Sequence, residues 1–301
     1  MLYSPGDIWV TSIREQLNVT ENYTDYALNF SSCSDLLHVL GHVRNLSPKL
    51  AAAFTAPFDS HAEGSTGGNY FSTNFKNVEI YIQAGEALGT VLRRGALDFT
   101  TIDRRVPAVV SANPARWSSD RLHTFCSVDY FTTETKSSLK NLFGYTRTLK
   151  RTTEPLCGTF AQDVPNTAQG NWFVKNTASF SEDPHLALVH DNLNSIYGIF
   201  SVGTALSSVT GLATEIYNFT PLHSGEYNRE FSEVASDGKV YCYDAIFGYD
   251  AIWGNLNSTA PKYPILIQLT SSTTLRVAKL SASSCGAGPW TIGNSFVEYE
   301  R

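Results

Sequence analysis

The stretch "YPILIQLTSSTTLRVAKL" (residues 263–280) decides the fold class, because two short apolar segments flank a polar turn. Segments of this length, rich in β-branched residues and bounded by turn residues, are typical of β-strands. Similar segments recur in the C-terminal half, and the further strands predicted there are His185–His190, Ile196–Gly203, Thr214–Phe219, Asn228–Val234, Lys239–Asp244 and Ser295–Glu300. Residues 236–238, Ser-Asp-Gly, are a hairpin signal between two of them. Many short strands at this spacing predict an antiparallel β-sandwich or small barrel.

The N-terminal part also carries the period-two pattern of strands, at Asp7–Ile13, Thr24–Phe30 and Val78–Ile82. "LSPKLAAAF" (46–54) predicts one short helix, whereas residues 56–68 are rich in Ser and Gly and predict a loop. The predicted fold is therefore all-β and mainly antiparallel, with one or two short helices.

The strongest helix signal after these strands lies within residues 129–149, where Ser and Thr can cap the first turn. We therefore predict a first β domain at 1–125, a helical connector at 126–151, and a β-sandwich or barrel domain at 152–301.

The composition limits the classes of partner. The 301 residues carry a net charge of -6, whereas nucleic-acid binding needs a basic face, so we expect no nucleic-acid partner. No run of 18 apolar residues is present, so we expect no membrane span. The first six residues lack the basic start and apolar stretch of a signal peptide, and an export leader is expected to be absent from this sequence.

Five cysteines occur, and none has the spacing of a zinc ribbon or a haem attachment site. We expect one or two disulfides in a protein of the extracellular space or cell envelope, with Cys157, Cys242 and Cys285 as candidates. The odd count leaves at least one thiol unpaired within the chain.

A second stretch, "GEALGTVLRRGALDF" (85–99), reads as a strand, a turn and another strand, and places Asp98 between Leu97 and Phe99. A carboxylate in a half-buried strand is costly unless it is paired, hydrogen-bonded or metal-bound. Asp98 is therefore expected either to bond with the turn at Arg93–Arg94 or to bind a metal.

Four pieces in this order resemble the lysostaphin-type zinc endopeptidases that cut peptidoglycan cross-links. They are "SPGDIWVTSI" (4–13), "LGHVRNLSP" (40–48), "IQAGEALGTV" (82–91) and "ALDF" (96–99). The resemblance implies a β domain in which His42 stands at the histidine of the family's Tyr-x-His motif. It also implies that Ala96 and Asp98 replace the two histidines of the family's His-x-His motif. The first strand of the family is missing, which is expected to leave a sheet edge covered by residues 56–68, by the C-terminal domain or by a second chain.

The resemblance implies a degenerate active site. A hydrolytic zinc needs three protein ligands and an open position, and the sequence offers Asp98 as a weak candidate ligand and His42 as a vestigial catalytic residue. We expect no bound zinc and no catalysis. If a metal were bound, His38, His61 or His123 would have to supply the missing ligands.

The C-terminal half holds other candidate site residues. His185 and His190 are five apart and point to opposite faces of a strand, which argues against a shared metal. His190 and Asp191 with His223 form a weak hydrolase-like set. Several aromatic residues are enough to line a glycan or peptide groove: Trp172, Phe173, Tyr241, Tyr243, Trp253 and Trp290. The ligand-binding candidates are Trp172, Phe173, His190, Asp191 and Trp253.

Three functions are compatible with these residues. The first is a non-catalytic extracytoplasmic module that binds the cell envelope, a glycan or a protein. The second is a zinc hydrolase of peptidoglycan whose N-terminal ligands lie outside this sequence. The third is a structural subunit that forms oligomers through a sheet edge. The C-terminal half also resembles the second domain of uncharacterised bacterial proteins, which implies no activity.

Overall fold

The computed structural model describes residues 1–66, 68–91, 96–144, 148–159, 161–177, 184–247 and 261–301. The chain divides into two compact units. Unit 1 holds residues 1–108 and 123–131, and unit 2 holds residues 109–122 and 132–301. The all-β prediction is confirmed, because both units are built on antiparallel strands.

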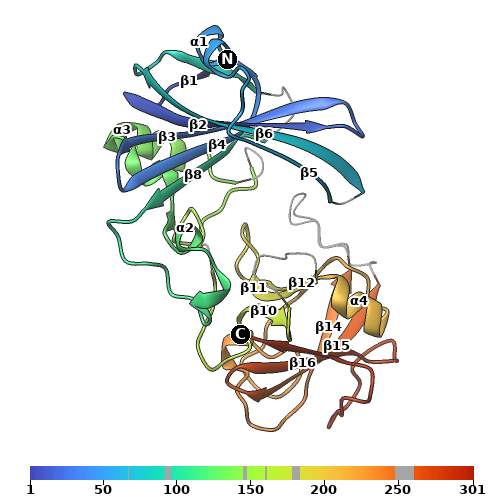
Figure 1. The fold of residues 1–301 in the computed structure, drawn as a ribbon. Coiled ribbons are helices and arrows are strands. Elements are labelled where there is room, and N and C mark those ends of the chain that lie inside the picture. The colour runs from blue at the N-terminus through green and yellow to red at the C-terminus, as the bar shows by residue number, and fades with distance from the viewer. Residues whose placement is uncertain (67, 92–95, 145–147, 160, 178–183, 248–260) are drawn as a thin grey trace. The chain divides into compact units, whose positions relative to one another are not determined.

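Unit 1 contains one sheet, ordered β1-β7-β4-β3-β2-β6-β5, with β8 paired to β4 and β9 paired to β8. The long strands β2, β3, β4 and β6 lie side by side (Figure 1). The strands span Leu2–Tyr3 (β1), Ile8–Asn18 (β2), Tyr23–Cys33 (β3), Leu36–Leu46 (β4), Ser60–Thr66 (β5), Asn69–Ile82 (β6), Ala87–Val91 (β7), Asp98–Asp103 (β8) and Thr124–Phe125 (β9). The three strands predicted in this part of the chain overlap β2, β3 and β6.

The core of unit 1 is formed by apolar side chains of this sheet together with a short helix. Ile8 and Val10 are buried on β2 while Trp9 between them is exposed, as the period of two requires. Helix α1 (Pro48–Ala53) adds the buried Leu50 to the same core. The Ser47 side chain caps this helix by accepting a hydrogen bond from the backbone N–H of Leu50.

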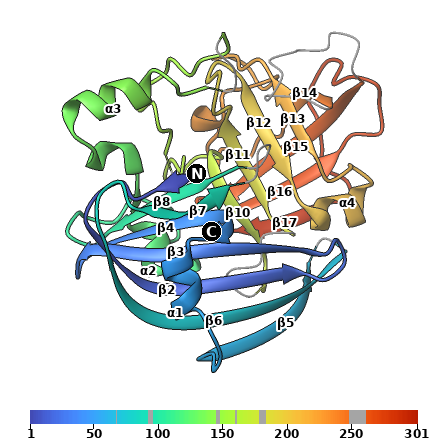
Figure 2. The same ribbon diagram turned by 90° about the horizontal axis from the view of Figure 1, so that it is seen from above.

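Residues 56–68 do not form the predicted loop, because they contain β5. This strand pairs with β6 from Ser60–Phe75 to Thr66–Asn69 without a shift of register, and it is the outermost strand on this side of the sheet (Figure 2). Residues 60–65 are all exposed. A strand without a buried face carries no hydrophobic alternation, so its pattern could not be distinguished from a loop.

Unit 2 contains a closed barrel in which eight consecutive strands pair antiparallel with their neighbours. The strands span Gly170–Val174 (β10), Leu186–His190 (β11), Gly198–Val202 (β12), Ile216–Phe219 (β13), Tyr241–Phe247 (β14), Lys262–Ser271 (β15), Thr274–Lys279 (β16) and Val297–Glu300 (β17). Of the predicted alternatives, the sandwich and the barrel, the barrel is the one formed.

Aromatic side chains pack the inside of the barrel. The ring centroid of Phe200 lies 5.0 Å from that of Phe231, 5.1 Å from that of Tyr243 and 5.7 Å from that of Phe219. All four rings are buried. A barrel of eight strands is just wide enough for side chains to fill, so this interior is a core.

The first and last barrel strands close the structure. Phe173 and Val174 of β10 pair with Glu300 and Tyr299 of β17. The next residue, Arg301, places its guanidinium 4.1 Å from the centre of the Trp172 ring. It also donates a hydrogen bond to the carbonyl oxygen of Gln169 at 2.9 Å. Burial lowers the pKa of Arg301 to about 10.

In unit 2, one strand prediction was wrong and one strand was missed. Residues 228–234 form no strand, because Glu230 caps a short 3₁₀ helix, η3 (Phe231–Glu233), and Phe231 enters the barrel core. The hairpin predicted at 236–238 is therefore absent. Conversely, β10 was missed, because its start at Gly170 depends on a close contact that the strand pattern does not show: φ is 129°, and a Cβ would lie 2.3 Å from Asp163 Oδ1.

The segment 109–122 belongs to unit 2, although the sequence placed it in the first domain. Arg116, at the end of η1 (Pro114–Arg116), pairs with Glu300 at 2.7 Å and lies 5.0 Å from the centre of the Phe173 ring. Its partners lie far away in the sequence, so local patterns could not reveal this attachment.

The described part of the chain contains four short α-helices, where one or two were predicted. Besides α1 they are α2 (Ser119–Leu122), α3 (Thr133–Lys140) and α4 (Thr204–Thr210), and a further 3₁₀ helix, η2, spans Ser127–Tyr130. α3 lies inside the predicted helical connector but covers only part of it. Among the described residues, none of the helices has the length and apolar character needed to cross a membrane.

Four of the five cysteines are disulfide-bonded. Cys242 on β14 pairs with Cys285, and Cys126 and Cys157 are also in disulfides. Cys33 is a free, exposed thiol. The sequence had left both the pairing and the free residue open.

The cysteine assignment makes a direct prediction for chemical labelling. An alkylating reagent added to the denatured but unreduced protein should modify one cysteine, Cys33, and after reduction it should modify all five. Mass spectrometry of the intact protein and of its peptides measures both numbers. Labelling of all five without reductant would contradict the disulfides.

Candidate functional site

His42 lies in a β-bulge at the surface of unit 1. Between the pairs Tyr26–Val43 and Leu28–Leu40, β4 contains two residues opposite one on β3. His42 has a φ of 62°, a left-handed backbone that is uncommon for residues other than glycine. A bulge turns side chains away from the regular pleat, and here it turns the His42 ring toward two carboxylates.

The two carboxylates flank the imidazole of His42. Its Nδ1 lies 2.6 Å from Asp25 Oδ2, and its Nε2 lies 3.4 Å from Asp98 Oδ2. Asp98 is not in the half-buried position expected from the sequence, since its side chain is 65% exposed. The turn at Arg93–Arg94, its other expected partner, lies outside the described residues.

These residues do not fit a hydrolytic zinc. His42 Nδ1 is occupied by Asp25, which leaves His42 Nε2 and Asp98 as two donors where three are needed. In the part of the chain that the structure describes, no group of three or more His, Cys, Asp or Glu residues is placed to hold a metal ion. We therefore derive no metal chemistry from unit 1.

The three histidines considered as further metal ligands have partners of their own. His38 Nδ1 lies 2.8 Å from Thr101 Oγ1, and burial lowers the pKa of this histidine. His61 Nδ1 lies 2.8 Å from the side-chain oxygen of Asn74, and His123 Nδ1 lies 3.0 Å from the carbonyl oxygen of Val106.

The structural carboxylate of unit 1 is Asp103, not Asp98. Asp103 is buried and accepts two hydrogen bonds from the Arg105 guanidinium and one from Tyr130, each 2.8 Å long. The hydrogen bonds from Arg105 hold the pKa of the Asp103 carboxyl well below its usual range. Burial and the hydrogen bond to Asp103 raise the pKa of Tyr130 to about 12.

Asp98 and Asp103 should therefore respond differently to substitution. Asp98→Asn should change the free energy of unfolding by less than about 1 kcal/mol, because its ion pair is exposed. Asp103→Asn should cost about 1–3 kcal/mol, because buried donors lose a charged acceptor. The contribution of Asp103 to the free energy of unfolding is present above pH ~4 and is lost as the pH falls toward its lowered pKa. Urea unfolding at pH 7 and pH 3 measures both effects, and equal costs at pH 7 would contradict the assignment.

In unit 2, His190 and Glu230 form an ion pair. His190 Nε2 lies 3.1 Å from Glu230 Oε1, and Nδ1 lies 2.8 Å from the carbonyl oxygen of Ser195. The hydrogen bond to Glu230 raises the pKa of His190, although burial opposes this shift. Burial would raise the pKa of Glu230, but its interactions, chiefly that with His190, lower it overall. With both ring nitrogens facing acceptors, the charged imidazolium is the favoured form.

This pair should give unit 2 a pH window of greatest stability. The contribution of His190 to the free energy of unfolding is present below pH ~6.5 and is lost as the pH rises through its raised pKa. The contribution of Glu230 is present above pH ~4.5 and is lost below it. Glu230→Gln should cost about 2 kcal/mol at pH 6 and flatten the loss of stability between pH 6 and pH 8. Thermal unfolding measures this, with His223→Gln as the control at an exposed histidine. An unchanged slope in Glu230→Gln would contradict the assignment.

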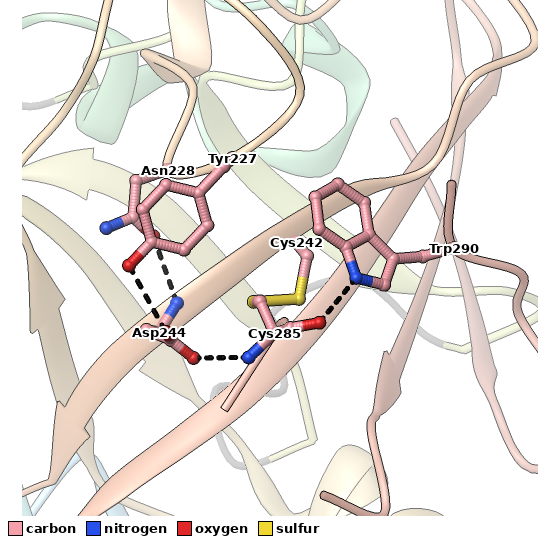
Figure 3. Close-up of a disulfide and its surroundings, with 6 residues drawn as sticks. All are labelled: Tyr227, Asn228, Cys242, Asp244, Cys285 and Trp290. Carbon is pink, nitrogen blue, oxygen red and sulfur yellow. Dashed lines mark hydrogen bonds between the residues drawn. A yellow bond between two sulfur atoms is a disulfide. The ribbon is translucent and has the colours of Figure 1, made fainter. Parts of the chain in front are cut away.

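A groove of about 910 Å³ lies on the outside of the barrel of unit 2. It is lined by Gly225, Glu226, Tyr227, Gly238, Lys239, Val240, Gln268, Gly286, Gly288, Pro289, Trp290, Thr291 and Ile292. The disulfide between Cys242 and Cys285 fastens one wall to β14, and beside it the indole N–H of Trp290 donates to the Cys285 carbonyl oxygen at 2.7 Å (Figure 3).

Hydrogen bonds to Asp244 hold the two walls of the groove in place. Asp244 accepts from the backbone N–H of Cys285 at 2.8 Å and from the Tyr227 hydroxyl at 3.1 Å (Figure 3). Its own backbone N–H donates to the side-chain oxygen of Asn228 at 2.9 Å. The groove is thus fixed by covalent and charged contacts before any ligand binds.

The groove combines an aromatic surface with polar groups. Trp290 and Tyr227 are half-buried, and Gly288 lies so close to the Trp290 ring that a Cβ there would be 3.2 Å away. Glu226 and Lys239 form an ion pair of 2.7 Å at its rim. The Gln268 amide donates to the Gly238 carbonyl oxygen at 3.1 Å, which fixes the orientation of the amide.

A second groove, of about 480 Å³, lies on unit 1 between the aromatic side chains of Tyr23, Tyr26, Phe54 and Phe58. Its polar groups are engaged internally: the Tyr26 hydroxyl donates to Glu15 at 2.9 Å. Arg44 donates to the Thr24 carbonyl oxygen at 2.7 Å. This groove is smaller and has no disulfide along its walls.

The ligand candidates taken from the sequence have structural roles. Trp172 is fully buried in the barrel, and Phe173 is packed against Trp117 and His185. His190 is engaged by Glu230, and Asp191 accepts hydrogen bonds from the backbone of Leu193 and Asn194. These four side chains have little surface left for a ligand. Trp253 lies outside the described residues.

Sequence reasoning named Trp290 among the groove aromatics but not as a site residue, and it missed Tyr227, Gln268 and the Glu226–Lys239 pair. A signal was present in "CGAGPW" (285–290), where two glycines and a proline link a cysteine to a tryptophan. No protein-family model matches the chain, and neither a curated protein nor a solved structure matches it significantly.

Proposed function

We propose that this protein is a non-catalytic module that binds a glycan of the cell envelope in the Trp290 groove of unit 2. The disulfide-bonded state of four cysteines supports a place outside the cytoplasm, where disulfides persist. Unit 1 is, in this proposal, a lysostaphin-like domain that has lost its catalysis, which is supported by the alanine at position 96 and by the two-donor set at His42.

The observation that carries the proposal is the chemistry of the groove. A sugar ring has an apolar face of C–H groups and a rim of hydroxyls. The half-buried indole of Trp290 can pack against such a face, and the fixed amide of Gln268 and the carboxylate of Glu226 can bond to hydroxyls. The volume falls in the range of small-ligand sites, and the disulfide reduces the ordering cost of binding.

The proposal predicts binding that depends on Trp290. Wild-type protein should bind soluble β-1,4-linked N-acetylglucosamine oligomers or purified peptidoglycan fragments. Trp290→Ala and Gln268→Ala should each weaken binding about tenfold or more, because truncating a central aromatic or hydrogen-bonding anchor costs about 1.4 kcal/mol or more. Isothermal titration calorimetry measures the affinity.

The matched control is Trp9→Ala, which removes an exposed tryptophan from unit 1. It should bind as the wild type does, and circular dichroism should show that the groove variants remain folded. Glycan binding that survives Trp290→Ala would contradict the groove. No binding to any glycan, together with binding to a protein of the envelope, would replace the glycan by a protein ligand.

A further inference from the structure

The exposed strand β5 of unit 1 has features of a pairing surface for a second copy of this chain. It pairs with β6 on one side, and no described strand pairs with its other side. Backbone N–H and C=O groups along a free edge are ready to pair with another strand. The strand is seven residues long, "SHAEGST" (60–66).

Natural edge strands are commonly protected by proline, lysine or a bulge. β5 contains no proline, lysine or arginine, and its ladder with β6 runs without a register shift. By contrast, the ladders of β2 with β3 and of β3 with β4 both contain shifts. Proline, lysine and a bulge are thus absent from β5.

When His61 is protonated, β5 carries one positive and one negative side chain, and two copies of it can have complementary charges. His61 and Glu63 are two residues apart on one face, with His61 Nε2 lying 3.6 Å from Glu63 Oε1. If two copies of the strand pair antiparallel about a two-fold axis through Ala62, then His61 of each copy lies opposite Glu63 of the other. Opposite charges in directly facing positions stabilise an antiparallel pair, and like charges destabilise it.

With the axis through Ala62, the side chains on the other face of the strand also pair without a steric clash. Ala62 faces its own counterpart on the axis, and Ser60 faces Gly64, so the second face carries only small residues. Moving the axis by one residue to Glu63 would set two glutamates opposite each other. The charge pattern therefore selects one register among the neighbouring ones.

We propose that this chain forms a two-fold symmetric dimer through antiparallel pairing of β5, with Ala62 on the axis. The proposal is independent of the glycan-binding function proposed for unit 2. A single strand pair buries little surface, so the dimer dissociates on dilution.

Cysteine crosslinking tests the register. Cys33 is first replaced by Ser, because it is a free, exposed thiol. In this background Ala62→Cys should form a covalent dimer under mild oxidation, because facing residues of an antiparallel pair have Cα atoms about 4.5–5.5 Å apart, within disulfide range. Gly64→Cys is the matched control, since a Cβ there meets nothing within 4 Å. Its two copies would lie about 14 Å apart and should not crosslink.

Charge variants test the complementarity, with sedimentation velocity over a range of concentrations as the measurement. The wild type should pass from monomer to dimer as concentration rises. His61→Glu should remain monomeric, and the double variant His61→Glu with Glu63→His should recover the dimer, because the exchange restores both pairs. His223→Glu, an exposed histidine of unit 2, should behave as the wild type does.

Three results would overturn the proposal: a wild type that is monomeric at the highest concentration, a His61→Glu variant that dimerises as the wild type does, or equal crosslinking at positions 62 and 64. Circular dichroism on each variant establishes that a monomeric result is not caused by unfolding.

Discussion

The pairing of β17 with β10 is the interaction on which unit 2 depends, because it converts a row of eight strands into a closed barrel. Without it, both end strands would present unpaired backbone groups, and the aromatic core would be open to water on one side. Arg301 strengthens the closure by packing on Trp172 next to the seam. Arg116 also stabilises the closure, because it forms an ion pair with Glu300 of β17.

Barrel closure also limits where the proposed ligand can bind. The interior is filled by aromatic side chains, so the outside walls remain, and there the chain between β16 and β17 is fastened to β14 by the disulfide of Cys285. Strand residues such as Gln268 and loop residues such as Trp290 thereby become two sides of one groove. The strands and the disulfide-bonded loop hold the groove in one shape, which reduces the conformational entropy that is lost on binding.

Strands with one buried face were predictable from the sequence, because burial imposes the period of two that is visible in β2 and β3. Features that leave no such period were not. β5 has no buried face, β10 begins at a glycine held against Asp163, and Glu230 bonds with the distant His190 instead of joining a strand. Likewise, the sequence singled out Asp98 because of its apolar neighbours, whereas the buried carboxylate is Asp103. Its partner Arg105 is local, but its burial and its partner Tyr130 depend on the fold.

NMR of the indole N–H groups can show whether the proposed ligand binds in the Trp290 groove. Each tryptophan gives one separate indole signal, which can be followed while a β-1,4-linked N-acetylglucosamine oligomer is added to the ¹⁵N-labelled protein. If the oligomer binds in the groove, the Trp290 signal should move in a saturable manner, whereas those of the buried Trp172 and of Trp9 on unit 1 should stay in place. A saturable shift of Trp9 with no change at Trp290 would rule out binding in this groove.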